Sequence, residues 1–459
     1  MSSITEAPTA TAARVFRSSA ALYLCLGLAM IWPRFATADA VTDWNAIAGK
    51  AARAACLSPL FDPFHESRAY AMMHIAVHDA LNALDRRSRP YAYNRRADPF
   101  ASAEAAVAAA SRNVLVAVIA QAPSFEGIPG CPGSIQAGID SVEADYAAAL
   151  AAIPNGPAKT AGLQVGQEAA AIILAIRAAD GSDTPFADAA YAQGTRPGEW
   201  RFTPGFDFAL IPGWRDVTPF VLKGSSQFRP GPPYSLRNHS YTADFNEVKA
   251  LGGDGINTPS GRSAEQTEIG LFWIDSSPLM WNRIARTLSA SEGLDLWENA
   301  RLFGLLNIAL ADGYIGSWET KYHYTFWRPI TAIQEADTDG NPDTVADTAW
   351  TPLQQTYPMP DYDSAHSVQG GAASEVLKLF FRRDRVAFST CSLTLPAGQT
   401  CDDATPTLRS YSTLSQAANE NGESRIYIGI HFRKGVEVGI EHGRKIGRRS
   451  VNLFMKPVN

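Results

Sequence analysis

The sequence predicts a mostly α-helical protein, built from helix bundles joined by long irregular loops. Apolar residues recur at helical spacing through alanine-rich stretches before residue 180, and the same spacing returns after Ser263. The alternation of apolar and polar residues that is typical of strands is scarce. With 46% hydrophobic and 19% charged residues, the chain of 459 residues can bury a large core. We therefore expect an all-α fold whose short connections bring separate helices together.

Residues 1–38 have the pattern of a secretory signal. Arg14 and Arg17 precede the apolar run Ala20–Trp32, and the small residues Ala36–Ala38 follow it. We expect cleavage after Ala38 and a secreted or periplasmic mature chain. An uncleaved membrane anchor is the alternative, although the apolar run is shorter than the about 20 residues that a span needs. No later segment is apolar and long enough to cross a bilayer.

Four cysteines follow the signal, and we expect them to form two disulfides. An exported protein folds in an oxidising compartment, where an even number of cysteines favours pairing. Cys391 and Cys401 flank a short polar loop, so we pair them with each other and Cys56 with Cys131. The spacings do not fit a zinc site, and the sequence alone leaves three pairings open.

Composition divides the mature chain into three regions. Residues 39–180 form an alanine-rich helical region. Residues 181–262 lose the helical period and are rich in Pro, Gly and aromatic residues, which predicts an ordered surface-covering segment or lids. Residues 263–459 form the C-terminal helical region, which opens with a capping box at Ser263 and Gln266. Further helices are expected at 289–311, 313–327, 364–381, 408–420 and 426–445.

Three short blocks in the C-terminal region concentrate cations and histidines. The blocks are Lys321–Pro329, Asp363–His366, and the segment from Ser424 and Arg425 to His431. The formal net charge of −6 argues against a nucleic-acid or anionic-membrane partner. These cations therefore indicate a local pocket for a small tetrahedral oxyanion, with phosphate and vanadate as the obvious candidates.

The first two blocks suggest how the anion is held. Lys321 and Arg328 are seven residues apart, close to two helical turns, so we expect both on one helix face. A guanidinium can bind two anion oxygens, and an ammonium acts as a point charge. Ser364 precedes a helix, so the Ala365 backbone N–H and the helix dipole favour an anion there. His366 in the first turn could exchange protons at working pH.

The third block joins a cation to a second histidine. Arg425 and His431 are six residues apart, so one continuous helix would place them on different faces. We expect Arg425 in the turn after Gly422 and His431 on the helix that follows. A neutral imidazole there could bond to phosphorus or coordinate vanadium.

In their order, spacing and chemistry, the three blocks resemble the motifs of the superfamily that unites vanadium-dependent haloperoxidases with phosphatidic acid phosphatase type 2 enzymes and bacterial acid phosphatases. The resemblance covers about residues 263–444. The helical N-terminal half, the export signal and the phrase His74–Ala80 look like the bacterial haloperoxidase branch. The resemblance implies that Lys321, Arg328 and Arg425 bind the equatorial oxygens of the anion, with further hydrogen bonds from Ser364 and the Ala365 backbone N–H. It also implies that His366 is the acid–base and that His431 is bonded to vanadium or phosphorus.

This resemblance implies an enzyme with a vanadate cofactor and no haem or flavin. The leading hypothesis is a vanadate-dependent haloperoxidase that oxidises halide with hydrogen peroxide. The alternative is a phosphomonoesterase that cleaves a phosphate ester through a phosphohistidine, because a phosphate in transfer and vanadate have nearly the same shape. A third option is an anion-binding protein without catalysis. The sequence is compatible with a homo-oligomer.

Three positions depart from the superfamily pattern, in which the second motif usually reads Pro-Ser-Gly-His. Here Asp363 and Ala365 replace its Pro and Gly, so Asp363 must point away from the anion or serve as the helix cap. Gly435 stands where an Asp usually follows the third-motif histidine, which leaves Glu437, Glu441 or a backbone carbonyl to orient His431. Met359 occupies a position linked to halide preference, so the halide stays open.

The remaining histidines have simpler interpretations. His74 and His78, one helical turn apart beside Asp79, are expected to be packed and hydrogen-bonded rather than to bind a metal. His323 lies among tyrosines that we expect in the core or the pocket wall, and His442 is expected on a solvated C-terminal face. The acid that orients His366 is expected among Glu265, Glu268 and Asp312.

Overall fold

The computed structural model describes residues 39–458, so the predicted signal sequence and residue 459 lie outside the described residues. Within that range the protein is helical apart from two short antiparallel pairs of strands, β1 (Ala187–Asp188) with β2 (Ala209–Leu210) and β3 (Phe388–Thr390) with β4 (Arg409–Tyr411). The all-α prediction is confirmed. No helix among these residues has both the length and the apolar character of a membrane span.

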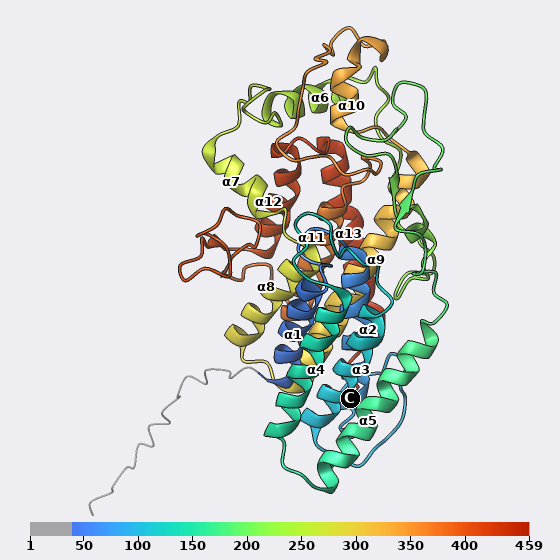
Figure 1. The fold of residues 1–459 in the computed structure, drawn as a ribbon, viewed down its shortest axis with the longest axis vertical. Helices are drawn as coiled ribbons and strands as arrows, with labels where there is room; N and C mark the ends of the chain where they lie inside the picture. Colours follow the sequence, from blue (N-terminus) through green and yellow to red (C-terminus); the bar gives the residue numbers. More distant parts are fainter. Residues whose placement is uncertain (1–38, 459) are drawn as a thin grey trace, which may run out of the picture. The chain divides into compact units, whose positions relative to one another are not determined.

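Five helices make up the N-terminal region. Almost every residue of α2 is buried beneath α1, α3 and α5, and α4 packs on α1 and α3. Figure 1 shows them in blue to green around the lower half of the view. Small alanine side chains let these helices approach closely, and their faces share one hydrophobic core. The helices are α1 (Ala40–Ala54), α2 (Pro63–Leu84), α3 (Ala103–Ile119), α4 (Ile135–Ala152) and α5 (Pro157–Ile176).

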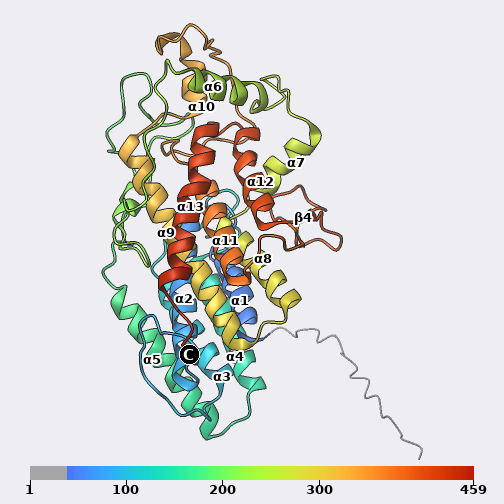
Figure 2. The same cartoon turned by 180° about the vertical axis from the view of Figure 1, so that it is seen from behind.

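The C-terminal region forms a second bundle, in which α9, α11 and α13 lie side by side (Figure 2). A Cβ atom at Gly443 of α13 would come within 1.9 Å of the Val368 carbonyl oxygen of α11, so only glycine permits this close contact. The elements are α6 (His239–Leu251), α7 (Ala264–Phe272), α8 (Ser277–Glu292), α9 (Leu296–Tyr324), α10 (Pro329–Gln334), α11 (Ala365–Phe381), α12 (Leu414–Tyr427) and α13 (Arg433–Leu453), with 3-10 turns η1 (Pro212–Asp216) and η2 (Ala336–Thr338).

The long helix α9 joins the two bundles because it packs on α2 as well as on α11 and α13. The sequence predicted two helices, broken near Gly313, and this was wrong. Gly313 does not end a helix, because a Cβ there would lie 2.7 Å from the Gln369 side chain, and the glycine instead permits close packing. The real start is a capping box at Asp295, and the real end is Thr325 with a left-handed φ of 46°.

Helix boundaries were also wrong in the last third of the chain. Residues 409–411 form β4, so α12 begins only at Leu414 and continues to Tyr427. The following helix α13 then begins at Arg433 rather than at 426. By contrast, the capping box at Ser263 and Gln266 and the helix start at Ser364 are confirmed.

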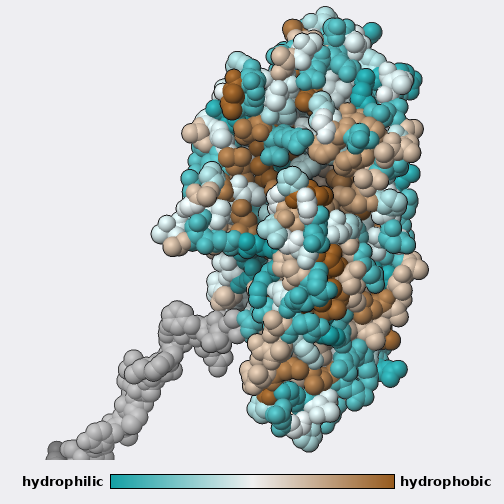
Figure 3. Space-filling view, viewed as in Figure 1, coloured by the Kyte–Doolittle hydropathy of each residue, from teal (hydrophilic) through white to brown (hydrophobic). Residues whose placement is uncertain are grey.

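The Pro/Gly/aromatic-rich segment packs its large side chains inward. Trp200 and Trp214 are each 1% exposed, and Trp318 and Tyr322 of α9 donate hydrogen bonds to the Leu210 carbonyl oxygen. This segment therefore covers one side of α9 up to the turn that carries Lys321. On the face drawn in Figure 3, hydrophobic and hydrophilic residues are interspersed.

Both predicted disulfides are present. Cys56 is bonded to Cys131, and Cys391 is bonded to Cys401. The second bond closes the loop between β3 and β4, as the short spacing between its cysteines suggested.

Candidate active site

The three sequence blocks converge where α9, α11 and α12 end or begin. Lys321 lies in the last turn of α9 and Arg425 in the last turn of α12, while Arg328 and Ser364 are the residues before α10 and α11. His431 lies in the loop between α12 and α13. The side chains are almost completely buried, with His366 half-buried at the edge.

Lys321 and Arg328 do not share a helix, which corrects the spacing argument. The helix ends at Tyr324, and the left-handed residue Thr325 redirects the chain before Arg328. Both side chains nevertheless reach the same place, because the backbone after Thr325 turns back toward the bundle and Arg328 begins the next helix.

The backbone of one short segment, Met359–Asp361, holds both cations. The Lys321 Nζ donates hydrogen bonds to the carbonyl oxygens of Pro360 and Asp361, at 3.0 and 2.9 Å. The Arg328 Nε donates to the Met359 carbonyl oxygen at 2.7 Å. These contacts fix the two side chains and leave their charges without a carboxylate of their own.

The site carries more buried positive than negative charge. Burial, and after it Arg328, lowers the pKa of Lys321 to about 7, and burial lowers the pKa values of Arg328 and Arg425 to about 10. Asp361 is the acid beside Lys321 and Arg328, and burial raises its pKa to about 7 although Arg328 and Lys321 oppose the shift. Buried charges are costly without partners, so this excess favours a bound anion.

Several polar atoms around the site have no hydrogen-bond partner within the described part of the chain. They are Nη2 of Arg328, Nε of Arg425 and Nε2 of His366. Ser364 does not cap its own helix, and its Oγ instead accepts a hydrogen bond from Ser367 at 2.9 Å. Since buried polar groups are nearly always paired, these atoms and the helix start are fit to receive a tetrahedral oxyanion.

His431 has a defined protonation state. Its Nδ1 lies 2.8 Å from Oδ1 of Asp361, and its Nε2 lies 3.1 Å from Nη1 of Arg328. Burial, followed by the charges of Arg328 and Lys321, holds the pKa of His431 well below its usual range. The ring is therefore neutral, and its Nε2 presents a lone pair.

The structure corrects three expectations for the third block. Arg425 belongs to α12 rather than to a turn after Gly422, and His431 precedes α13 rather than lying on it. Glu437 and Glu441 are both exposed, and the acid that contacts His431 is Asp361. No sequence pattern pointed to Asp361, and the glycine at 435 indicated only that the usual acid is absent from that position.

His366 lies in the first turn of α11 as predicted, but the expected acids do not orient it. Asp312 accepts hydrogen bonds from backbone N–H groups of Phe220–Leu222, and Glu265 and Glu268 pair with Arg409. The pKa of His366 is lowered well below its usual range by burial and then by Arg425, while hydrogen bonds with the backbone of residues 274–275 oppose this.

Asp363 points away from the cations, as the sequence required. Its Oδ1 accepts a hydrogen bond from Ser317 at 2.8 Å, and its Oδ2 lies 2.7 Å from Nδ1 of His442. His442 is 1% exposed, so the expectation that it lies on a solvated face was wrong. The two residues form a buried pair between α11 and α13 that secures the base of the site.

The N-terminal histidines are core residues, as expected. His74 lies 2.8 Å from the Asn45 amide, and His78 contacts Asp79 at 2.8 Å and Ser88 at 2.6 Å. No group of three or more His, Cys, Asp or Glu side chains among residues 39–458 is arranged to hold a metal ion.

A buried acid lies close to the segment that contacts His366. Glu66 of α2 is 1% exposed and accepts a hydrogen bond from Ser276, the residue before α8. Burial raises the pKa of Glu66 from its ordinary value of 4.5 to about 7. As the pH rises, the unfolded chain therefore loses this proton first, and between about pH 4.5 and 7 the folded protein becomes less stable.

Glu66→Gln should remove this pH dependence. The difference in free energy of unfolding, variant minus wild type, should increase by about 3 kcal/mol between pH 4.5 and 7. The wild type loses this stability over that range and the variant does not, and 1.36 kcal/mol corresponds to one pKa unit. Urea denaturation at a series of pH values measures the difference, with the exposed Glu437→Gln as control. A difference between Glu66→Gln and wild type that does not change with pH would contradict the assignment.

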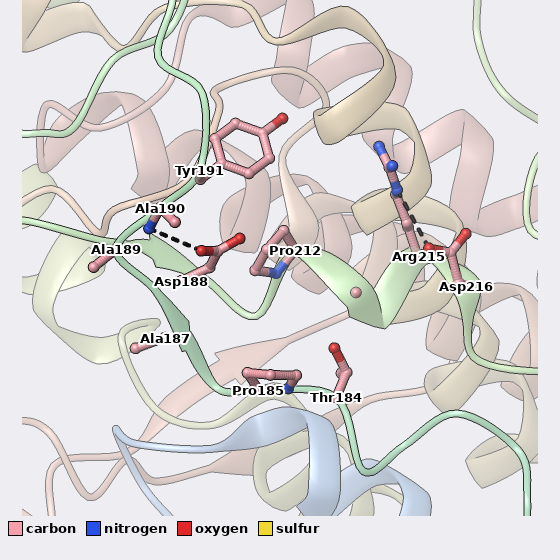
Figure 4. Close-up of a pocket in the computed structure, with 11 residues that line it drawn as sticks. Thr184, Pro185, Ala187, Asp188, Ala189, Ala190, Tyr191, Pro212, Arg215 and Asp216 are labelled. Carbon is pink, nitrogen blue, oxygen red and sulfur yellow. Dashed lines mark hydrogen bonds and ion pairs between the residues drawn. The ribbon is translucent and has the colours of Figure 1, made fainter.

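A surface pocket of about 610 Å³ lies elsewhere, between β1 and η1 (Figure 4). Its charged side chains are engaged locally: Arg215 pairs with Asp216, and Asp188 accepts the backbone N–H of Ala190. None of the predicted site residues lines this pocket. The surface pocket is therefore separate from the buried cluster of cations and histidines.

Known proteins share this sequence pattern and fold. The family model for the second helical-bundle domain of VCPO matches residues 301–459. The vanadium chloroperoxidase of Curvularia inaequalis is 26% identical over 266 residues, which cover 46% of this chain and 43% of that protein. The chain thus matches less than half the length of this curated relative.

Solved structures extend the likeness in fold to nearly the whole chain. A bacterial vanadium-dependent iodoperoxidase superposes with a TM-score of 0.72 at 24% identity, covering 92% of this chain and 97% of that one. The apo form of a bacterial vanadium-dependent chloroperoxidase gives 0.66 at 15% identity, covering 86% and 94%. Together, these findings show that the chain has the helical fold of vanadium-dependent haloperoxidases and that residues 301–459 match the second helical-bundle domain of VCPO.

Proposed function

We propose that this protein is a vanadate-dependent haloperoxidase, which oxidises a halide ion with hydrogen peroxide. The observation that carries the proposal is the excess of buried cations around a neutral histidine. Asp361 lies beside Lys321 and Arg328, Arg425 lies near Arg328, and His431 is surrounded by all three cations. The names of the relatives support vanadate as the oxyanion.

The residues of the site suit distinct tasks. Lys321, Arg328 and Arg425 would hold the oxygens of vanadate, and His431 Nε2 would bind its vanadium. The uncapped start of α11, at Ser364 and Ala365, would add hydrogen bonds. When bound, vanadate supplies a Lewis-acid centre that activates peroxide toward a halide.

His366 is the proposed acid–base. Burial and Arg425 keep its ring neutral, so it can accept a proton from hydrogen peroxide and return that proton later. Its Nε2 has no partner among the described residues, which leaves this atom available for the transfer. Arg328 and Arg425 need no change of protonation, because they only hold and polarise the bound oxygens.

A paired assay tests the proposal. Metal-stripped protein is incubated with vanadate, peroxide and bromide while halogenation of an organic dye is followed, and vanadate-free protein is assayed on an aryl phosphate. We expect halogenation that requires vanadate, survives in the exposed-residue control His239→Ala and is lost in His431→Ala. Hydrolysis of the aryl phosphate without halogenation would instead establish the phosphomonoesterase. No activity in either assay would mean that the protein binds anions without catalysis.

We also propose that the mature chain is exported. The two disulfides support an oxidising compartment. The mass of the protein recovered from outside the cytoplasm checks this, since it should correspond to a chain that begins after Ala38. Recovery of the intact chain from the cytoplasm would contradict it.

A further inference from the structure

The side chain of Asp361 and the backbone of Gly435 lie next to each other in the site. Asp361, in the loop before α11, contacts His431 through Oδ1 at 2.8 Å. Gly435 lies in the first turn of α13, and a Cβ atom built there would come within 3.2 Å of Oδ2 of Asp361. The carboxylate of Asp361 therefore lies against position 435, and a side chain there would have to displace it by a few tenths of an ångström.

Asp361 is held rigidly from both sides of its peptide. Its backbone N–H donates to the Phe326 carbonyl oxygen at 2.8 Å, and its own carbonyl oxygen accepts the hydrogen bond from Lys321. The side chain is completely buried. The backbone of Asp361 is therefore fixed at the site, and burial and the contact with Nδ1 keep its carboxylate beside His431.

The contact with Asp361 selects the tautomer of His431. A neutral imidazole has one N–H donor and one acceptor nitrogen. An ionised carboxylate only accepts, so this contact places the proton on Nδ1 and leaves Nε2 unprotonated. Nη1 of Arg328 lies 3.5 Å from Nδ1 and 3.1 Å from Nε2, so it does not distinguish the two nitrogens.

We infer that Asp361 is the positioning residue for His431, and that Gly435 is its necessary complement. In the superfamily pattern this acid stands at the position of Gly435, four residues after the histidine. In this chain the carboxylate comes from the loop before α11, and the glycine makes room for it. The part of the inference that concerns vanadate rests on the proposed function.

The tautomer can be measured without any cofactor. In protein labelled with ¹⁵N-histidine and free of vanadate, the His431 nitrogen shifts and couplings should report a proton on Nδ1. Asp361→Asn should raise the fraction with the proton on Nε2, because an amide can donate as well as accept. A wild-type ring that carries its proton on Nε2 would overturn the inference.

Vanadate affinity gives the second readout, measured by equilibrium dialysis of the full mature chain. Asp361→Asn should weaken binding by about 10- to 100-fold, the usual effect of losing the hydrogen-bond partner of a ligand histidine. The exposed Asp337→Asn is the matched control and should bind as the wild type does. Unchanged tautomer and affinity in Asp361→Asn would overturn the inference.

Exchanging the residues at positions 361 and 435 tests whether a carboxylate from either position can orient His431. Gly435→Asp alone should bind vanadate weakly, because its side chain meets the existing carboxylate. The double variant Asp361→Gly/Gly435→Asp should bind more tightly than either single variant. A double variant no better than both would contradict the complementarity of the two positions.

The two proposals fail separately. If the wild type carries its proton on Nδ1 and loses this state in Asp361→Asn, Asp361 positions His431 even when vanadate does not bind. If vanadate binds and supports halogenation but the tautomer is indifferent to Asp361, only the positioning role is wrong.

Discussion

His366→Ala should lower kcat for halide oxidation by about 10²–10⁴-fold, the usual contribution of a positioned acid–base. His366 is neutral because burial and Arg425 depress its pKa, so it is ready to take a proton. It neither contacts Asp361 nor supplies one of the cations, so its removal should affect proton transfer far more than vanadate binding. Steady-state rates at saturating vanadate measure the effect.

Comparing the effects of His366→Ala on kcat and on vanadate affinity distinguishes an acid–base role from a structural one. His366→Ala should keep vanadate affinity within about 10-fold of the wild type, since loss of one uncharged contact costs about 1 kcal/mol. The exposed His239→Ala should change neither quantity. Equal losses in affinity and kcat/KM with unchanged kcat would show that His366 only holds the anion.

Asp363→Ala should reduce the free energy of unfolding by about 2–5 kcal/mol, because leaving a buried polar group without its partner costs about 1–3 kcal/mol and two such groups lose their acceptor. Asp363 and His442 are almost completely buried and 2.7 Å apart, and Ser317 also donates to the carboxylate. Its loss leaves two buried polar groups on α9 and α13 without their acceptor. Urea denaturation at pH 7 measures the change.

A surface pair provides the matched control. Asp402 pairs with Arg53, and both side chains are about half exposed. Asp402→Ala should cost at most about 1 kcal/mol, because solvent screens exposed pairs. A cost below about 1 kcal/mol for Asp363→Ala would mean that the Asp363–His442 pair does not secure the site.

Local signals in the sequence predicted much of the fold. The capping box at Ser263, the helix start at Ser364 and the short Cys391–Cys401 loop were all confirmed, because each depends on residues close together in the chain. The break near Gly313 was wrong because a glycine within a helix can serve packing as well as termination. Distinguishing the two requires knowledge of Gln369, which lies on another helix.

The sequence predicted the cluster of cations, but not the backbone arrangement that brings these residues together. Lys321 and Arg328 meet through the turn at Thr325, which no helical spacing describes. Asp361 is 70 residues from His431 in the sequence, so no local pattern joins them. The sequence offered only an indirect sign, the glycine at 435.

The buried pair of Asp363 and His442 was missed for a similar reason. Asp363 was expected either to point away from the anion or to cap the helix, and its contact with Ser317 fits the first of these alternatives. His442 was placed on a solvated face because its neighbours along the helix are charged. Its partner is 79 residues away, so its burial depended on how closely α11 and α13 approach.

Diffraction from crystals of the mature protein soaked in vanadate tests the central claim most directly. We expect one anomalous vanadium peak bonded to Nε2 of His431, with its oxygens in contact with Lys321, Arg328 and Arg425. A vanadium peak at another site, or none at a vanadate concentration that saturates binding in solution, would contradict the assignment of this cluster as the oxyanion site.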